Sequence, residues 1–142
     1  MTTIRTTTGP TTADSKTTDG SGLGLFTSAL SSLQPNTLYY VRAYATNGGG
    51  TAYGNEITFT TASTIPTLIT SAISSIGTTT AVSGGNITSN GGQNVTVRGI
   101  CWSTSPNPTT ADNTTSDGTG SGLFASNITG LSPNVTYYVR AY

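Results

Sequence analysis

The sequence predicts an all-β fold made of two packed antiparallel sheets. About a third of the residues are Ser or Thr, with 18 Gly and one Met, and strong helix formers are scarce. Short alternating stretches are separated by Gly, Pro and Asn turn signals, and no segment has the helical period of about 3.6 residues. Aromatic residues recur at regular places, which argues against a disordered chain.

Four strands are predicted in the second half of the chain, at residues 81–87, 95–102, 123–128 and 137–142. Asn90-Gly91-Gly92 signals a hairpin turn after the first of them. Pro106 and Pro108 end the second, because proline cannot donate to a β-ladder. A glycine-rich turn at residues 117–122 precedes the third, and a corner at residues 133–134 precedes the last.

The first half predicts a long strand at residues 39–46, a turn at 47–50 and a strand at 55–61. Ile57 and Phe59 of this last strand lie on one face. Short strands at regular spacing indicate an immunoglobulin-like sandwich of seven strands and about 100 residues per unit.

The sequence repeats itself with a period of 98 residues, since Tyr39–Tyr44 (YYVRAY) recurs as Tyr137–Tyr142. The match extends upstream at the same offset without a gap. It pairs Leu33-x-Pro35-Asn36 with Leu131-x-Pro133-Asn134, Leu25-Phe26 with Leu123-Phe124, and Pro10–Asp14 with Pro108–Asp112. A match of this length does not arise by chance.

The register of the repeat predicts two partial domains. Residues 1–62 are the C-terminal part of one repeat without its opening strands, and residues 63–142 are a second repeat without its last strand. The chain is either an excerpt from a tandem array or a subunit whose open ends neighbouring copies complete. We favour an array or polymer, because residues 10–44 are duplicated rather than divided between the halves.

The chain carries few charges, five Lys or Arg against five Asp or Glu. It therefore has no long-range electrostatic field that would attract nucleic acid. The sequence also contains no apolar run of about 20 residues that would insert into a membrane. Residues 1–10 are too polar for a signal peptide. Solubility must come from hydroxyls, attached glycans or burial in an assembly, so we expect an extracellular or cell-surface location.

Catalysis is not expected, because the chain has no His and few acids. Asp14 and Asp19 recur as Asp112 and Asp117, always on turns. They could bind calcium, but two carboxylates are few, and we favour Asp residues that cap their own turns. No metal or cofactor is predicted. The single cysteine, Cys101, permits no intrachain disulfide and is expected to be a small buried residue.

Alternation along the repeated motif predicts an outward aromatic and cationic stripe. The candidate contact residues are Tyr40, Arg42, Tyr44, Tyr138, Arg140 and Tyr142, joined by Arg98 and Trp102 if their strand is adjacent. Such a stripe stacks on sugar rings, or it packs within a sheet surface or against a neighbouring domain, and we favour packing. Candidate glycosylation sites begin at Asn86, Asn94, Asn113, Asn127 and Asn134.

The closing-strand pattern of residues 33–50, which runs from Leu33-x-Pro35 through Tyr39-x-Val41, resembles that of fibronectin type III domains. The resemblance implies that Tyr39 and Tyr137 occupy the tyrosine corner of that family. The wider pattern, with residues 98–104 (RGICWST) followed by Asn-Pro-Thr and the closing strand, is similar to tandem repeats in surface proteins of Bacteroidota-type bacteria. The early part departs from animal fibronectin repeats, so the resemblance covers fold and tandem architecture but no ligand motif.

These observations predict a structural repeat module of an extracellular fibre, filament or surface stalk, assembled end to end across short linkers such as residues 62–65. Its partners would be copies of itself. The alternative is a glycan-binding adhesin module that uses the Tyr-Arg-Tyr stripe, with carbohydrate as the partner.

Overall fold

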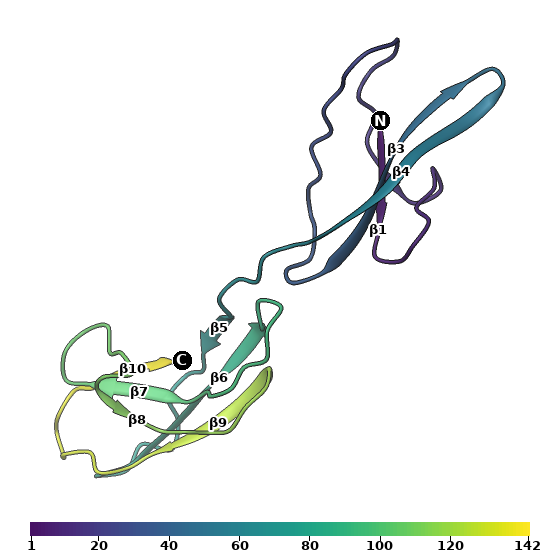
Figure 1. The fold of residues 1–142 in the computed structure, drawn as a ribbon. Helices are drawn as coiled ribbons and strands as arrows, with labels where there is room; N and C mark the ends of the chain where they lie inside the picture. The colour runs from purple at the N-terminus through teal and green to yellow at the C-terminus, as the bar shows by residue number, and fades with distance from the viewer. The chain divides into compact units, whose positions relative to one another are not determined.

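A computed structural model describes the whole chain, residues 1–142, with ten strands and no helix. All pairings between strands are antiparallel. The all-β class predicted from composition and alternation is confirmed. No helix that could cross a bilayer is present. The chain divides into two compact units, Met1–Ser63 and Thr64–Tyr142 (Figure 1).

Unit 1 is a single four-stranded sheet in the order β2-β1-β3-β4. Its strands are β1 (Thr2–Arg5), β2 (Ser15–Lys16), β3 (Leu38–Asn47) and β4 (Gly50–Thr60). The last two form a long hairpin (Figure 1). Asn47 shapes its turn, because its Oδ1 accepts a hydrogen bond from the Gly49 N–H at 2.8 Å.

In unit 1, only part of one face of the sheet is buried. Ile4, Tyr39 and Val41 form its buried cluster, against which Leu30 and Leu33 pack. Ile57 lies directly opposite Val41 and therefore shares its face, yet its side chain is 65 % exposed. Residues 17–37 between β2 and β3 contain no strand, so no second sheet covers this face.

Unit 2 has two layers, each a three-stranded sheet, in the orders β5-β6-β9 and β10-β7-β8. The strands are β5 (Thr67–Thr70), β6 (Ala81–Ser89), β7 (Ile100–Ser103), β8 (Asn113–Thr114), β9 (Gly122–Ile128) and β10 (Tyr138–Ala141). Ala81, Ile100 and Ile128 form the buried cluster, with contributions from both layers. Trp102, Phe124, Leu131, Val139 and Ala141 pack around it.

Two adjacent glycines of β6 let the strand approach its neighbours closely. A Cβ at Gly84 would lie 2.0 Å from the backbone oxygen of Phe124 on β9. A Cβ at Gly85 would lie 2.8 Å from the Cβ of Ala141, which belongs to the other layer. Glycine at these two positions therefore sets both the strand spacing and the layer spacing at this point of unit 2.

The predicted strand at residues 95–102 is shorter in the structure, where β7 covers only Ile100–Ser103. The residues before it bond to an irregular partner: the Arg98 N–H donates to the Gly118 carbonyl at 3.0 Å, and the Gly120 N–H to the Val95 carbonyl at 2.9 Å. Gly118 and Gly120 have φ values of 93° and 83°, which an extended strand does not adopt. A regular ladder cannot form against that backbone.

The predicted count of seven strands is found in neither unit, since unit 1 has four and unit 2 has six. Four short strands, β1, β2, β5 and β8, were not predicted from the sequence. Each has two or four residues, too few for alternation to be recognised.

Candidate functional site

Residues 98 positions apart occupy the same structural places in their own units. Strand β1 begins at Thr2 and β7 at Ile100, whereas β2 begins at Ser15 and β8 at Asn113. Within each unit these strands pair with each other, and the first of them also pairs with the strand that carries the YYVRAY motif. The units can therefore be compared residue by residue.

The aspartates of the repeat are engaged within their own turns. Oδ2 of Asp14 accepts the Thr11 N–H at 2.8 Å, and Oδ2 of Asp112 accepts the Thr109 N–H at the same distance. The Thr11 N–H bond holds the pKa of Asp14 below its usual value, with Arg5 contributing. No group of three or more His, Cys, Asp or Glu is placed to hold a metal ion.

The second aspartate of each copy accepts hydrogen bonds from hydroxyl groups. Oδ2 of Asp19 accepts the hydroxyls of Ser28 and Thr17, each at 2.6 Å, and these bonds lower the pKa of Asp19. Oδ2 of Asp117 accepts the Thr115 hydroxyl at 2.7 Å. Both carboxylates thus fasten the start of the glycine-rich turns instead of facing an open site.

Each copy has a tyrosine whose hydroxyl caps the loop before its strand. The Tyr39 hydroxyl accepts the Gln34 N–H at 3.0 Å, and the Tyr137 hydroxyl accepts the Ser132 N–H at 3.1 Å. In both cases the partner lies five residues upstream. This geometry is that of a tyrosine corner.

The predicted Tyr-Arg-Tyr stripe is only partly open in unit 1. Tyr44 is 7 % exposed, and its hydroxyl donates to the Thr17 carbonyl at 2.9 Å. Tyr40 and Arg42 are half-buried, and the Arg42 guanidinium lies 4.7 Å from the centre of the Tyr53 ring. Alternation placed these side chains on one face, but it gave no information on Thr17, the residue directly after β2, whose carbonyl accepts the Tyr44 hydroxyl.

In unit 2 the stripe keeps two exposed members, Tyr138 and Arg140. Tyr142 is half-buried and anchored, because its hydroxyl donates to the Thr115 carbonyl. Trp102 does not join the stripe: it pairs with Val139 and packs against the core cluster.

Arg98 also stays apart from the stripe. Its guanidinium donates to the carbonyls of Gly120 and Ser121 at 3.1 and 3.2 Å, and it lies 5.3 Å from the centre of the Phe124 ring. These contacts fasten the glycine-rich turn, so the side chain has a local structural role.

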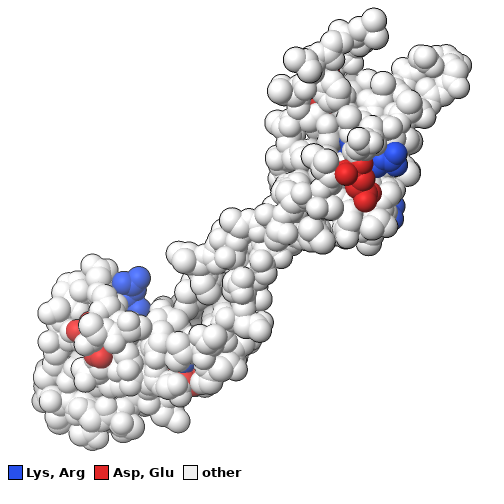
Figure 2. Space-filling view, viewed as in Figure 1, with Lys and Arg blue, Asp and Glu red and all other residues white.

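Charged groups are few and scattered. Figure 2 shows small separate groups of charged atoms on a surface whose other residues are uncharged. The Arg5 and Asp14 side chains approach to 3.4 Å, and the Glu56 carboxylate accepts the Gly9 N–H at 2.6 Å. Such contacts fasten loops and form no extended surface of one sign.

Cys101 is buried, with 2 % of its surface exposed. Its Sγ lies 3.4 Å from the carbonyl oxygens of Pro108 and Arg140. Burial raises the pKa of the thiol. The position 98 residues earlier is Thr3, which is fully buried and donates its hydroxyl to the Thr11 carbonyl. A small polar side chain therefore fills the same place in both units.

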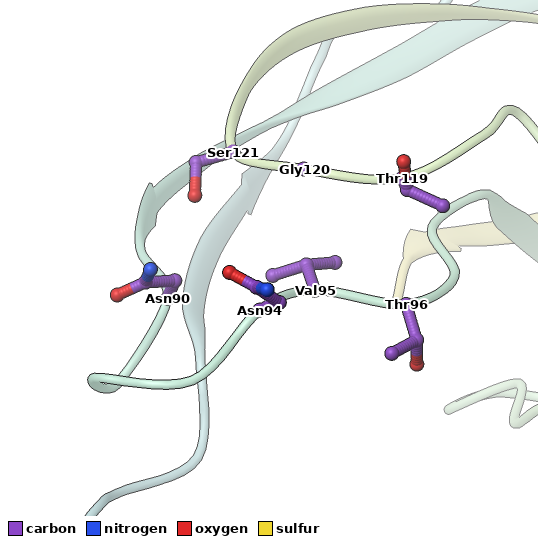
Figure 3. A pocket seen from close by; sticks show the side chains of 7 residues that line it. All are labelled: Asn90, Asn94, Val95, Thr96, Thr119, Gly120 and Ser121. Carbon is purple, nitrogen blue, oxygen red and sulfur yellow. The ribbon is translucent and has the colours of Figure 1, made fainter. Parts of the chain in front are cut away.

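An uncharged depression of about 560 Å³ lies beside the turn after β6 (Figure 3). Its lining carries amide, hydroxyl and Val side chains and no charge, and consists of Asn90, Asn94, Val95, Thr96, Thr119, Gly120 and Ser121. Asn94 is one of the four exposed candidate glycosylation sites, with Asn113, Asn127 and Asn134. Asn86 is half-buried in β6.

An apolar cavity of about 230 Å³ lies at the open side of unit 2 and was not predicted from the sequence. Its lining includes Ile73, Ile76, Trp102, Val135, Tyr137 and Val139. The signal that could have revealed it is the pair Ile57 and Phe59, which in the first copy lies opposite the equivalents of Val139 and Tyr137.

No family model matches the chain, and no curated protein matches it. Among solved structures, the chain is similar to the crystal structure of chicken CNTN1 FN1-FN3 domains, with 17 % sequence identity and a TM-score of 0.39. The similarity covers 78 % of this chain and 36 % of that one, so the chain spans about a third of the length of the structure it matches.

Proposed function

We propose that the chain is a structural repeat module of an extracellular fibre or surface stalk, built from fibronectin type III-like sandwiches with a period of 98 residues. The observation that carries this proposal is the agreement of contacts between the copies. Asp14 and Asp112 make the same turn bonds, and Tyr39 and Tyr137 make the same corner bond.

The strand inventory supports a seven-stranded repeat. β1 and β7 are equivalent, as are β2 and β8, and β10 matches the middle of β3 at the 98-residue offset. When each equivalent pair is counted once, the ten strands reduce to seven. Unit 1 contributes β4 to this set, and unit 2 contributes β5, β6 and β9. Seven is the number of strands in an immunoglobulin-like sandwich of about 100 residues.

The first residue of unit 2, Thr64, is hydrogen-bonded to the turn after β6, which supports a short linker with little freedom at this end. The Thr64 N–H donates to the Gly91 carbonyl at 2.8 Å. A Cβ at Gly91 would lie 1.9 Å from the Thr64 oxygen, so only glycine permits this approach. Residues that directly follow the unit boundary are thereby held to the turn after β6.

Composition supports an extracellular location. The chain has few charges and many hydroxyl groups, and four of its five candidate glycosylation asparagines are exposed. Glycans on these positions would supply the surface solubility that charges do not.

One observation favours glycan binding as a second function: Tyr138 and Arg140, two positions apart on one face of β10, are both exposed. An aromatic ring and a guanidinium can stack on a sugar ring and bond its hydroxyls. A broad glycan array probed with the chain and with Arg140→Ala tests it. Binding that the substitution abolishes would support the adhesin function, and an array without signal would remove it.

Cryo-electron microscopy of the native material, with its denatured chain mass, tests the structural function. We expect filaments or stalks with sandwich domains arranged end to end. A long covalent chain would identify a tandem array, and noncovalent subunits near 14.4 kDa would identify a polymer. A native material of isolated globular particles would contradict the proposal.

A further inference from the structure

Two asparagines of the chain, Asn47 and Asn90, directly precede a glycine. At such a pair the backbone nitrogen of the glycine can attack the side-chain amide carbon of the asparagine, because glycine has no Cβ to obstruct the approach. The new C–N bond closes a succinimide ring, and ammonia leaves with the proton of the glycine nitrogen. Water then opens the ring at one of its two carbonyl groups and gives aspartate or isoaspartate.

Both asparagines begin a glycine-rich turn and make the same side-chain bond. Oδ1 of Asn47 accepts the Gly49 N–H at 2.8 Å, and Oδ1 of Asn90 accepts the Gly92 N–H at 3.0 Å. Both asparagines are exposed. The side chains therefore do not distinguish the two sites, and a difference in reactivity must come from the backbone of the glycine that follows.

The backbone after Asn90 is held in place. The Gly91 N–H donates to the Ser89 hydroxyl at 3.2 Å, and the Gly91 carbonyl accepts the Thr64 N–H at 2.8 Å. Gly91 is buried, and an added Cβ there would lie 1.9 Å from the Thr64 oxygen, so the two backbones are in close contact. The nitrogen that must attack is thus engaged as a donor, and its movement toward the Asn90 side chain breaks these bonds.

The backbone after Asn47 is open. Gly48 is exposed, its N–H donates to no acceptor in the chain, and a Cβ there would meet no atom within 4 Å. It lies at the tip of the β3–β4 hairpin, where Asn47 pairs with Gly50 across the turn (Figure 1). The Gly48 nitrogen is therefore hydrated, and it can lose its proton to solvent and turn toward the Asn47 side chain without breaking a bond.

We propose that Asn47 is a site of spontaneous deamidation in the folded protein, and that the fold protects Asn90 from the same reaction. The only co-reactant is water. The formal net charge of the chain is zero, so each conversion gives the molecule a net negative charge at neutral pH. This modification goes beyond the proposed structural function and does not depend on it.

The two products differ in their effect on the hairpin. Aspartate keeps a side-chain oxygen that can accept the Gly49 N–H. Isoaspartate lengthens the backbone by one carbon, so it should disrupt the end of the ladder, where Thr46 pairs with Thr51 and their hydroxyls bond at 2.8 Å. Hydrogen exchange at the amides of these two threonines should therefore be faster in the isoaspartate form than in the aspartate form.

The test incubates the full folded chain in warm neutral buffer and follows both sites by peptide mapping with mass spectrometry. Conversion of an amide to an acid changes the mass, whereas isomerisation at the Asp-Gly pairs of the chain does not, so the readout is specific to asparagine. We expect Asn47 to react at least about tenfold faster than Asn90, because hydrogen bonds must open only at Asn90. The modified chain should also be retained longer on an anion-exchange column.

Matched variants separate the effect of the backbone from that of the sequence. Gly48→Ala, which has space for its Cβ, should slow the reaction at Asn47 at least about tenfold by obstructing the attack. Ser89→Ala releases the Gly91 N–H and should speed the reaction at Asn90. In urea the two sites should react at similar rates. Equal rates in the folded chain, a faster reaction at Asn90, or no reaction at Asn47 under conditions that convert the unfolded chain would each overturn the proposal.

Discussion

Replacing Gly84 by alanine should destabilise unit 2 strongly, because the added methyl group has no space. The new Cβ would lie 2.0 Å from the Phe124 oxygen and 3.1 Å from the Ala125 Cα. Both atoms belong to the backbone of β9, so no side-chain rotation relieves the contact. β6 and β9 must separate by more than about an ångström to reach an ordinary contact distance near 3.5 Å.

The magnitude follows from what that separation removes. β6 and β9 are paired from Ala81 opposite Ile128 to Ile87 opposite Gly122, and Gly84 lies in the middle of this ladder. Lost ladder hydrogen bonds contribute about 1 kcal/mol each, and overpacking of a filled interior costs typically about 1–3 kcal/mol. We therefore expect Gly84→Ala to lower the free energy of unfolding of unit 2 by about 2–4 kcal/mol.

Equilibrium urea denaturation followed by Trp102 fluorescence measures this change in unit 2 alone, since unit 1 has no tryptophan. Ser116→Ala is the control within unit 2, because Ser116 is exposed and lies outside the strands. The control should change the free energy by less than about 0.5 kcal/mol. A loss below about 1 kcal/mol for Gly84→Ala would show that β6 and β9 are not packed as described.

Three further predictions concern single side chains. Tyr137→Phe should destabilise unit 2 by about 1–2 kcal/mol in the same urea assay, because the Ser132 N–H loses its acceptor, and an unchanged midpoint would argue against the corner bond. The lowered pKa values of Asp14 and Asp19 mean that their contribution to stability is present above about pH 4 and is lost as the pH falls through the folded-state values. Circular dichroism should therefore show acid destabilisation that Asp14→Ala together with Asp19→Ala removes, and an equal acid response of that double variant would contradict the assignment. Cys101 should react with a thiol reagent only on unfolding, and rapid labelling of the native chain would contradict its burial.

The sequence predicted the long strands well because their pattern is local. β6 and β9 follow from alternation and from the Asn90-Gly91-Gly92 turn, and β3 and β4 from the YYVRAY motif and the glycines after it. β7 was predicted too long, because its partner backbone at Gly118 and Gly120 is irregular, and a single strand's alternation contains no information on its partner.

The candidate site was harder to predict than the fold. Alternation placed Tyr44 on the outward face beside Arg42. The structure buries Tyr44 and bonds its hydroxyl to Thr17 directly after β2, a contact that alternation along one strand could not predict. The cavity lined by Tyr137 and Val139 could not be recognised from alternation either, since Ile73, Ile76 and Leu131, which also line it, lie outside the strands.

The bond between Thr64 and Gly91 determines how unit 2 responds to a pulling force. Tension that enters at Thr64 acts first on this one hydrogen bond and then on β5, a strand of four residues that runs antiparallel to β6. β5 is a short strand at the edge of its sheet, so it should detach before the longer ladder between β6 and β9.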